Sequence, residues 1–363
     1  MWQLIDLHGP LSLRARDRAG RFPEFFAGLV PTLATLAERA KLDADVLAGD
    51  VYQRFMAKGD GIYRELVSAM SAPLGGDGLA ALKQRFIAAR DAHLDQARRV
   101  QSAVAYDRAL TLMQAGLRAV ADATGDVDGY LATFSSVDTR PPVHATDMAR
   151  RLADAGRADE ALAVLDHAAP DFDDTPDCHI NWSNARLLAL GKLGRADDVK
   201  ALNWELFETY LSHAHLRAYL KLLPDFDDME AEEQALNWVA RHTAFMPALL
   251  LLVRWPALSR AAGMVTERTR DIDGSSHDLL LPAAEALDGK FPLAGILIRR
   301  ALISFILKLG RRHRFKQAMQ HVRELEALHA AVEDYAAHED HQAFMERLWL
   351  DHPHTAGFWS LLE

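Results

Sequence analysis

The chain has 363 residues, of which half are hydrophobic and a quarter are charged, and its formal net charge at pH 7 is −10. This composition is typical of a folded globular protein and excludes a disordered or fibrous one. The acidic charge argues against a protein that holds nucleic acid over its whole surface, because that binding depends largely on neutralising phosphates. The single cysteine, Cys178, excludes an internal disulfide and a zinc site made of thiolates. A cytoplasmic protein is the simplest interpretation.

The N-terminal part, residues 1–133, has the periodicity of helices. Helices are expected over residues 22–41, 45–57 and 62–71, and two longer ones between residues 78 and 124. The apolar stripe of the first helix consists of Phe25, Phe26, Leu29, Leu33, Leu36 and Ala37. Runs of β-branched residues and Asn-Gly turns are nearly absent, which argues against β-sheet.

A boundary is expected at residues 125–145, where serine, threonine, aspartate and proline cluster. It divides the chain into an irregular helical region at 1–133, a region of tetratricopeptide-like helical hairpins at 134–289, and a C-terminal helical cap at 290–363 that packs on the same stack. The expected fold class is all-α, an α-solenoid of antiparallel helix pairs.

The repeat signal is the tetrapeptide Gly-Arg-Ala-Asp, which occurs at residues 156–159 and again at 194–197. The two copies start 38 residues apart, from Gly156 to Gly194, close to the period of about 34 residues in tetratricopeptide repeats. A weaker copy starts at Gly310. Glycine can end a helix in a left-handed conformation, and aspartate can begin the next. Each hairpin needs a neighbour to bury its apolar face, so degenerate stacked repeats are predicted.

A second repeated segment is the pentapeptide Pro-Asp-Phe-Asp-Asp, found at residues 170–174 and 224–228. Proline stops a helix, the phenylalanine is expected to enter the core, and the aspartates suit the start of the following helix. A calcium loop is the alternative, because carboxylates are hard oxygen ligands. Neither copy continues with the glycine and distal glutamate of such a loop, and a helix connection is favoured.

Two apolar runs, at residues 246–253 and 293–309, are expected to be buried helices. The first is too short to span a bilayer, and the second is interrupted by charged residues, among them Arg299 and Lys308. No leader of a charged and then apolar segment opens the sequence, and no membrane association is expected.

Several segments together resemble the bacterial domain-of-unknown-function family 6880. They are Trp-Glu-Leu-Phe-Glu at 204–208, Leu-Lys-Leu-Leu-Pro-Asp-Phe-Asp-Asp at 220–228, Phe-Pro-Leu-Ala-Gly-Ile-Leu-Ile-Arg-Arg-Ala-Leu at 291–302 and the closing Gly-Phe-Trp at 357–359. The resemblance covers most of the chain and implies an all-helical, tetratricopeptide-like body without an established reaction. Members of the family usually carry further helices upstream, so the resemblance also implies an N-terminally shortened form whose first helix exposes apolar surface.

Four histidines near the C-terminus are candidate metal ligands: His338, His341, His352 and His354. Imidazole suits zinc, but the His-Glu-x-x-His spacing of zinc peptidases is absent. Capping and packing roles are favoured, and no metal or other cofactor is expected.

The only strong concentration of positive charge includes Arg299, Arg300, Arg311, Arg312, Arg314 and Lys316. These residues are candidates for binding an anion such as a phosphate or a nucleic-acid backbone. The competing interpretation is a solvated helix end, where cations interact favourably with the helix dipole.

Residues between 181 and 241 are expected to line a groove on the concave face that holds a peptide or protein. The candidates are Asn181, Trp182, Asn184, Arg186, Trp204, Tyr210, Arg217, Tyr219 and Arg241. No nucleophile elbow, phosphate loop or dinucleotide-binding motif occurs, and we expect no enzyme.

Two functions therefore remain open. The first is a scaffold that binds a protein or peptide partner, or a second copy of itself. The alternative is a nucleic-acid or phosphate-binding module that uses the cations of residues 299–316.

Overall fold

The computed structural model describes residues 2–14, 21–58, 61–99, 108–134, 141–171 and 173–361. Throughout these ranges the regular structure is helical, without a β-strand, which confirms the predicted all-α class. The chain forms two compact units, residues 1–194 and 195–363. The three regions predicted from the sequence are not tested by this division and remain a prediction.

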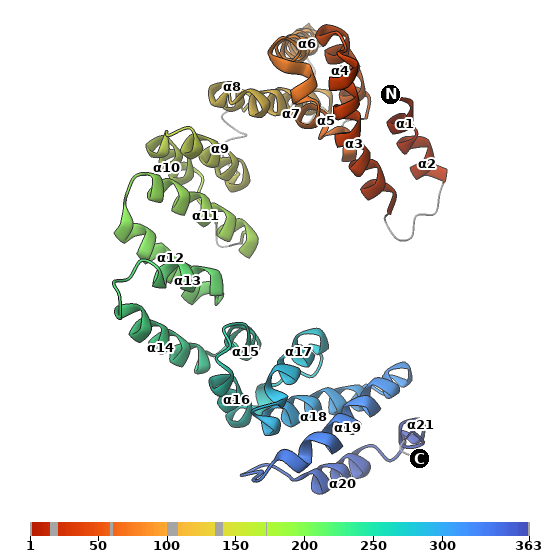
Figure 1. The fold of residues 1–363 in the computed structure, drawn as a ribbon, viewed down its shortest axis with the longest axis vertical. Helices are drawn as coiled ribbons and strands as arrows, with labels where there is room; N and C mark the ends of the chain where they lie inside the picture. The colour runs from red at the N-terminus through yellow and green to blue at the C-terminus, as the bar shows by residue number, and fades with distance from the viewer. Residues whose placement is uncertain are drawn as a thin grey trace. The chain divides into compact units, whose positions relative to one another are not determined.

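The first unit begins with short helices and continues with longer ones (Figure 1). Its helices are α1 (Gln3–Asp6), α2 (His8–Arg14), α3 (Arg21–Ala40), α4 (Ala44–Lys58), η1 (Gly61–Tyr63), α5 (Leu66–Ala69), α6 (Ser71–Arg99), α7 (Arg108–Thr124), α8 (Val127–Leu131), α9 (Pro142–Asp154), α10 (Ala158–His167) and α11 (Pro176–Lys192). Helices α3, α4, α6 and α7 confirm four of the predicted elements. Leu4 on α1 and Leu7 directly after it are about half exposed, at 49% each, whereas Ile5 of the same helix is buried.

The buried stripe of α3 differs in part from the predicted one. Phe26, Val30 and Leu33 are buried, whereas Phe25 and Leu36 are exposed, so the prediction was wrong for the last two. Residues 26, 30 and 33 follow one line along a helix of 3.6 residues per turn, and residues 25 and 36 lie roughly a quarter-turn to its side.

The predicted third helix at residues 62–71 is divided. The 3₁₀ turn η1 and the short helix α5 fill most of this range, and α6 already begins at Ser71. Gly75 interrupts α6 with a φ of 57° and ψ of −171°. Glycine adopts this conformation without the strain of a side chain, and the helix resumes beyond the kink.

The expected joint at residues 125–145 contains the short helix α8. The Asp126 carboxylate accepts a hydrogen bond from the Gly129 backbone N–H at 2.8 Å and from Lys83 Nζ at 2.7 Å. This capping and ion pair explain why a helix begins where the composition indicated only a connection. Residues 135–140 lie outside the described part of the chain.

The predicted left-handed glycines are confirmed, with φ of 80° at Gly156, 70° at Gly194 and 59° at Gly310. In the first unit, Gly156 ends α9, which packs against both α10 and α11. The expected start of the next helix was wrong in detail: Arg157, not an aspartate, is the N-cap residue of α10. Its guanidinium instead pairs with Glu160 in the first turn at 2.8 Å.

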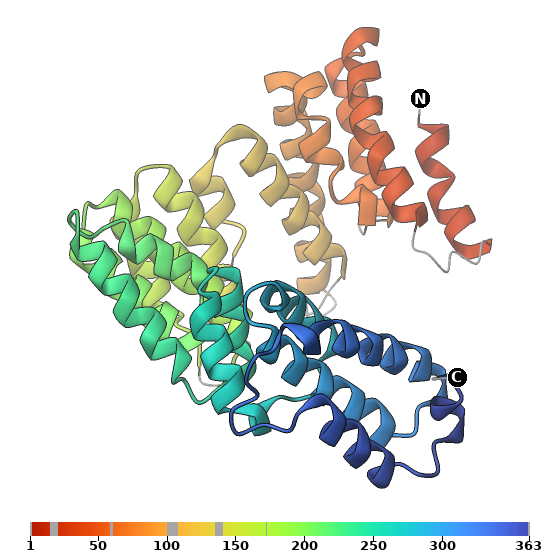
Figure 2. The ribbon, with the colours of Figure 1, turned by 60° about the horizontal axis from the view of Figure 1, so that its bottom comes forward.

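The second unit consists of the remaining helices, among which α18 packs against both α17 and α19 (Figure 2). Its elements are α12 (Ala196–Tyr210), α13 (His213–Leu220), α14 (Asp227–Ala240), α15 (Phe245–Arg254), α16 (Leu258–Glu267), η2 (Thr269–Asp271), α17 (His277–Asp288), α18 (Pro292–Lys308), η3 (Arg312–Arg314), α19 (Phe315–Leu328), η4 (His329–Ala331), α20 (His341–Asp351) and α21 (Ala356–Trp359). The two apolar runs are the largely buried helices α15 and α18, as predicted.

One pentapeptide expectation is wrong. Phe226 does not enter the core but is 82% exposed, because it is the N-cap residue of α14 and has a φ of 76°. Asp227 and Asp228 do lie in the first turn of α14, where the helix dipole favours them. The other phenylalanine, Phe172, lies outside the described residues.

Candidate functional site

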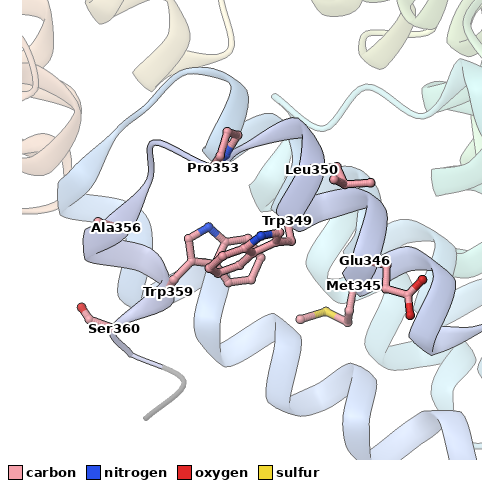
Figure 3. A pocket seen from close by; sticks show the side chains of 8 residues that line it. All are labelled: Met345, Glu346, Trp349, Leu350, Pro353, Ala356, Trp359 and Ser360. Atoms are coloured by element: carbon pink, nitrogen blue, oxygen red, sulfur yellow. The ribbon is translucent and has the colours of Figure 1, made fainter.

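The last two helices of the second unit line an open apolar pocket of about 830 Å³. Figure 3 shows its lining side chains, which come from α20, from α21 and from the turn between them. They are Met345, Glu346, Trp349, Leu350, Pro353, Ala356, Trp359 and Ser360. Glu346 is the only ionisable residue among them, so burial of apolar surface is the main interaction this pocket offers.

Two tryptophans form one wall of this pocket (Figure 3). The ring centroids of Trp349 and Trp359 are 4.8 Å apart with an angle of 58° between the planes. Trp359 is fixed from behind, because its Nε1–H donates to the His352 backbone oxygen at 3.0 Å and its ring contacts Phe358. Its position is therefore set within the protein.

The outer side of the pocket is exposed. Leu350 is 75% and Trp349 is 54% accessible to solvent, although both are large apolar side chains. A rigid aromatic wall beside exposed apolar side chains is typical of a binding surface, where tryptophan contributes strongly to affinity. This site was not predicted from the sequence, although the pair of tryptophans, Trp349 and Trp359, on either side of Pro353 indicates it.

The predicted groove residues are divided between the two units. In the first unit, Trp182 on α11 donates its Nε1–H to the Leu165 backbone oxygen at 3.2 Å, and Arg186 on the same helix pairs with Asp166. Asn181 and Asn184, also on α11, are exposed.

In the second unit, the rings of Trp204 and Tyr219 pack at 4.9 Å. The guanidinium of Arg217 lies over the ring of Trp255 at 5.0 Å, Tyr210 ends α12, and Arg241 is exposed at the end of α14. The groove that would unite both sets remains a prediction.

The structure separates the basic cluster into three environments. Arg299 is buried and pairs with Asp288 at 2.6 Å and Glu324 at 2.8 Å. Its charge is neutralised inside the unit, in contrast to the surface role expected from the sequence. Arg300 is also buried, on another face of α18, because consecutive helical residues point about 100° apart.

The other cations of the cluster surround the turn η3. Arg311, Arg312 and Lys316 are exposed and Arg314 is partly exposed. The ion pairs found across the described chain include none of these four side chains. They form a local positive surface on an otherwise acidic protein.

The four C-terminal histidines do not gather around one point. His341 stacks on His329 with ring centroids 5.0 Å apart, and the backbone oxygen of His352 accepts the Trp359 hydrogen bond. His338 lies before α20, and His354 is exposed in the turn before α21. Within the described ranges, no group of three or more histidine, cysteine, aspartate or glutamate side chains is arranged to hold a metal ion.

The fold and this pocket define an all-helical protein that presents an apolar site at the end of its second unit. The chain matches the family model "Family of unknown function (DUF6880)" over residues 1–361 and belongs to that family. Comparisons with curated proteins and with solved structures gave no match. Within the described helices, none is long and apolar enough to cross a membrane.

Proposed function

We propose that the chain is a cytoplasmic scaffold of stacked, tetratricopeptide-like helix pairs that binds a protein partner. The observation that supports this function is the apolar pocket between α20 and α21. We assign to it a short segment of the partner that carries large apolar side chains and one basic residue. The apolar side chains would bury Trp349 and Leu350, and the basic residue would pair with Glu346.

The form of the pocket supports a peptide segment as its occupant. Its volume of about 830 Å³ lies in the range of pockets that bind sizeable ligands. Burial of exposed apolar surface contributes about 25 cal/mol per Å², so Leu350 and Trp349 can together supply much of the binding energy of a weak complex. No catalytic step is part of this proposal, and the predicted groove between residues 181 and 241 would be a second contact surface.

Selection of a displayed random peptide library on the full chain tests the proposed function. We expect enriched peptides to combine large apolar residues with lysine or arginine. In a titration, Leu350→Asp should weaken the binding of the synthesised peptides at least about tenfold, because it places a charge in an apolar contact. Val46→Asp is the matched control, since Val46 is also an exposed apolar side chain but lies on α4, outside the pocket and outside residues 181–241.

The same variants separate other outcomes. Peptides that bind Leu350→Asp as tightly as the natural chain would contradict the pocket as their site. Concentration-dependent dimerisation in sedimentation experiments that Leu350→Asp abolishes would assign the pocket to a second copy instead.

The alternative is a nucleic-acid or phosphate-binding module, favoured by the unpaired cations around η3. Arg311, Arg312, Arg314 and Lys316 have no ion-pair partner in the described part of the chain. This function would require salt-sensitive binding of an oligonucleotide, since phosphate contacts release counterions. The net charge of −10 favours the protein-binding scaffold.

A further inference from the structure

A second cavity of the C-terminal unit, of about 360 Å³, lies between α18, the turn η2 and the segment that leads into α20. Its polar lining contains three arginines and one carboxylate. The polar and charged residues that matter for its chemistry are Arg270, Arg300, Ser304, His338, Glu339 and Arg347. All belong to the second unit, so the cavity does not depend on how the units are placed.

Arg300 is the unusual member of this lining. Its side chain is only 6% exposed, and its guanidinium donates to two backbone oxygens, of Glu339 at 2.7 Å and Asp340 at 3.0 Å. The face of the Phe344 ring lies 4.6 Å from its central carbon. No carboxylate oxygen in the described chain lies within ion-pairing distance of it, and its Nε has no hydrogen-bond partner there.

This contrasts with the preceding residue. Arg299 is equally buried but is held between two carboxylates. A buried cation without a direct ion-pair partner is costly, because it has lost its hydration and carboxylates such as Glu339 and Asp340 attract it only from beyond ion-pairing distance. Burial accordingly lowers the pKa of Arg300, although an arginine stays protonated at neutral pH.

Other groups around the cavity reinforce the excess of positive charge. Arg270 is exposed and has no ion pair within the described ranges. Arg347 is shared between Glu339 at 2.8 Å and Asp351 at 3.4 Å. Two of the three guanidinium groups therefore lack a carboxylate partner. One helical turn beyond Arg300, on the same face of α18, Ser304 adds a hydroxyl donor.

We propose that this cavity is a binding site for a small dianion, either a phosphate or a dicarboxylate, held between Arg270 and Arg300 with Ser304 as a further donor. Guanidinium groups bind both kinds of oxyanion through paired N–H donors. The ligand would supply the counterion that Arg300 lacks. This site is distinct from the exposed cations around η3 and from the apolar pocket, and it does not rest on the proposed scaffold function.

Titration calorimetry of the full chain with inorganic phosphate, and separately with malonate, tests the site. Ionic strength is held constant with sodium chloride. Saturable binding of one equivalent is expected, and Arg270→Ala should weaken it about tenfold, because one charge-assisted contact is lost. The tighter of the two anions identifies the class of ligand. Arg323→Ala is the control, since Arg323 is an exposed arginine on α19 that does not line the cavity.

Arg300→Met is the second variant, with a side chain of similar length and no charge. It should abolish phosphate and malonate binding. The free protein should still fold but unfold at a lower temperature, because the Glu339 and Asp340 backbone oxygens lose their donors. A phosphate site on the exposed cations would instead be weakened by Arg312→Ala and not by Arg270→Ala. That result, or the absence of saturable binding of both anions to the natural chain, would overturn the proposal.

Discussion

His321 lies in the core of the second unit with its two ring nitrogens in different surroundings. It is 2% exposed, its Nδ1 lies 3.1 Å from Glu324 Oε2, and its Nε2 has no partner within the described residues. His277 and Arg299 lie nearby and oppose a positive charge on the ring. Burial lowers the pKa of His321, so the folded protein holds this ring neutral.

Acidification should therefore destabilise the second unit. The unfolded chain binds a proton at residue 321 near the ordinary histidine pKa of about 6.5, and the folded chain does so only at lower pH. Above about pH 6.5, residue 321 leaves the free energy of unfolding unchanged. This free energy decreases as the pH falls below that value. We expect the decrease in midpoint temperature between about pH 7.5 and 5.5 to be smaller in His321→Gln than in the natural chain.

Circular dichroism melts at the two pH values measure this difference. His354→Gln is the control, since His354 is exposed. Burial also lowers the pKa of His215 and of His341, so part of the pH dependence should persist in His321→Gln. An unchanged pH dependence in that variant would show that residue 321 contributes nothing to it.

The candidate sites also show what one sequence could not indicate at the residue scale. Arg299 and Arg300 are consecutive and read as one basic cluster, but they face different parts of the unit. Which of them meets Asp288 and Glu324 depends on the packing of α17 and α19, and these contacts are far apart in sequence. The apolar pocket could not be predicted either. A tryptophan such as Trp349 is expected in the core, and the sequence does not show which side of α20 is exposed.

At the scale of elements, the ends of helices were predicted well where a residue in the turn itself stops the helix. The Gly-Arg-Ala-Asp copies gave the ends of α9 and α11, because a left-handed glycine stops a helix through its own backbone. The prediction was less accurate where a side chain decided the outcome. Helix α8 begins because Asp126 caps it and binds Lys83, a contact with a residue of α6 that no local pattern contained.

Two glycines of the first unit allow the role of the turn to be tested with one kind of substitution. Gly156 has a φ of 80° and no atom within 4 Å of an added Cβ, and Gly191 within α11 has the same free space without a positive φ. Gly156→Ala should destabilise the unit by about 1 kcal/mol, because alanine is strained in the left-handed region. Gly191→Ala should stabilise it by up to about 1 kcal/mol, because alanine favours a helix.

Urea unfolding followed by circular dichroism gives both free energies. Opposite signs for the two substitutions would support the turn as the reason for Gly156. A loss of stability in Gly191→Ala of the same size as in Gly156→Ala would contradict the conformational explanation, since both sites have room for a methyl group.

At the scale of the whole molecule, the division into units is matched by the hydrophobic clusters. One cluster extends from Trp2 to Val120 within the first unit. Another joins Phe207 to Leu302, and a third joins Ile296 to Trp359, both within the second unit. Burial of apolar side chains is the main source of folding stability, so each unit holds a core of a size that supports folding.

We therefore expect two thermal transitions in calorimetry of the full chain, each sensitive to its own variant. Gly156→Ala should lower one midpoint by about 2–4 °C, as a loss of about 1 kcal/mol does in units of this size. Asp288→Asn should lower the other by about 4 °C or more, because it removes a partner of the buried Arg299. A single transition that both substitutions shift would show that the two units unfold cooperatively as one.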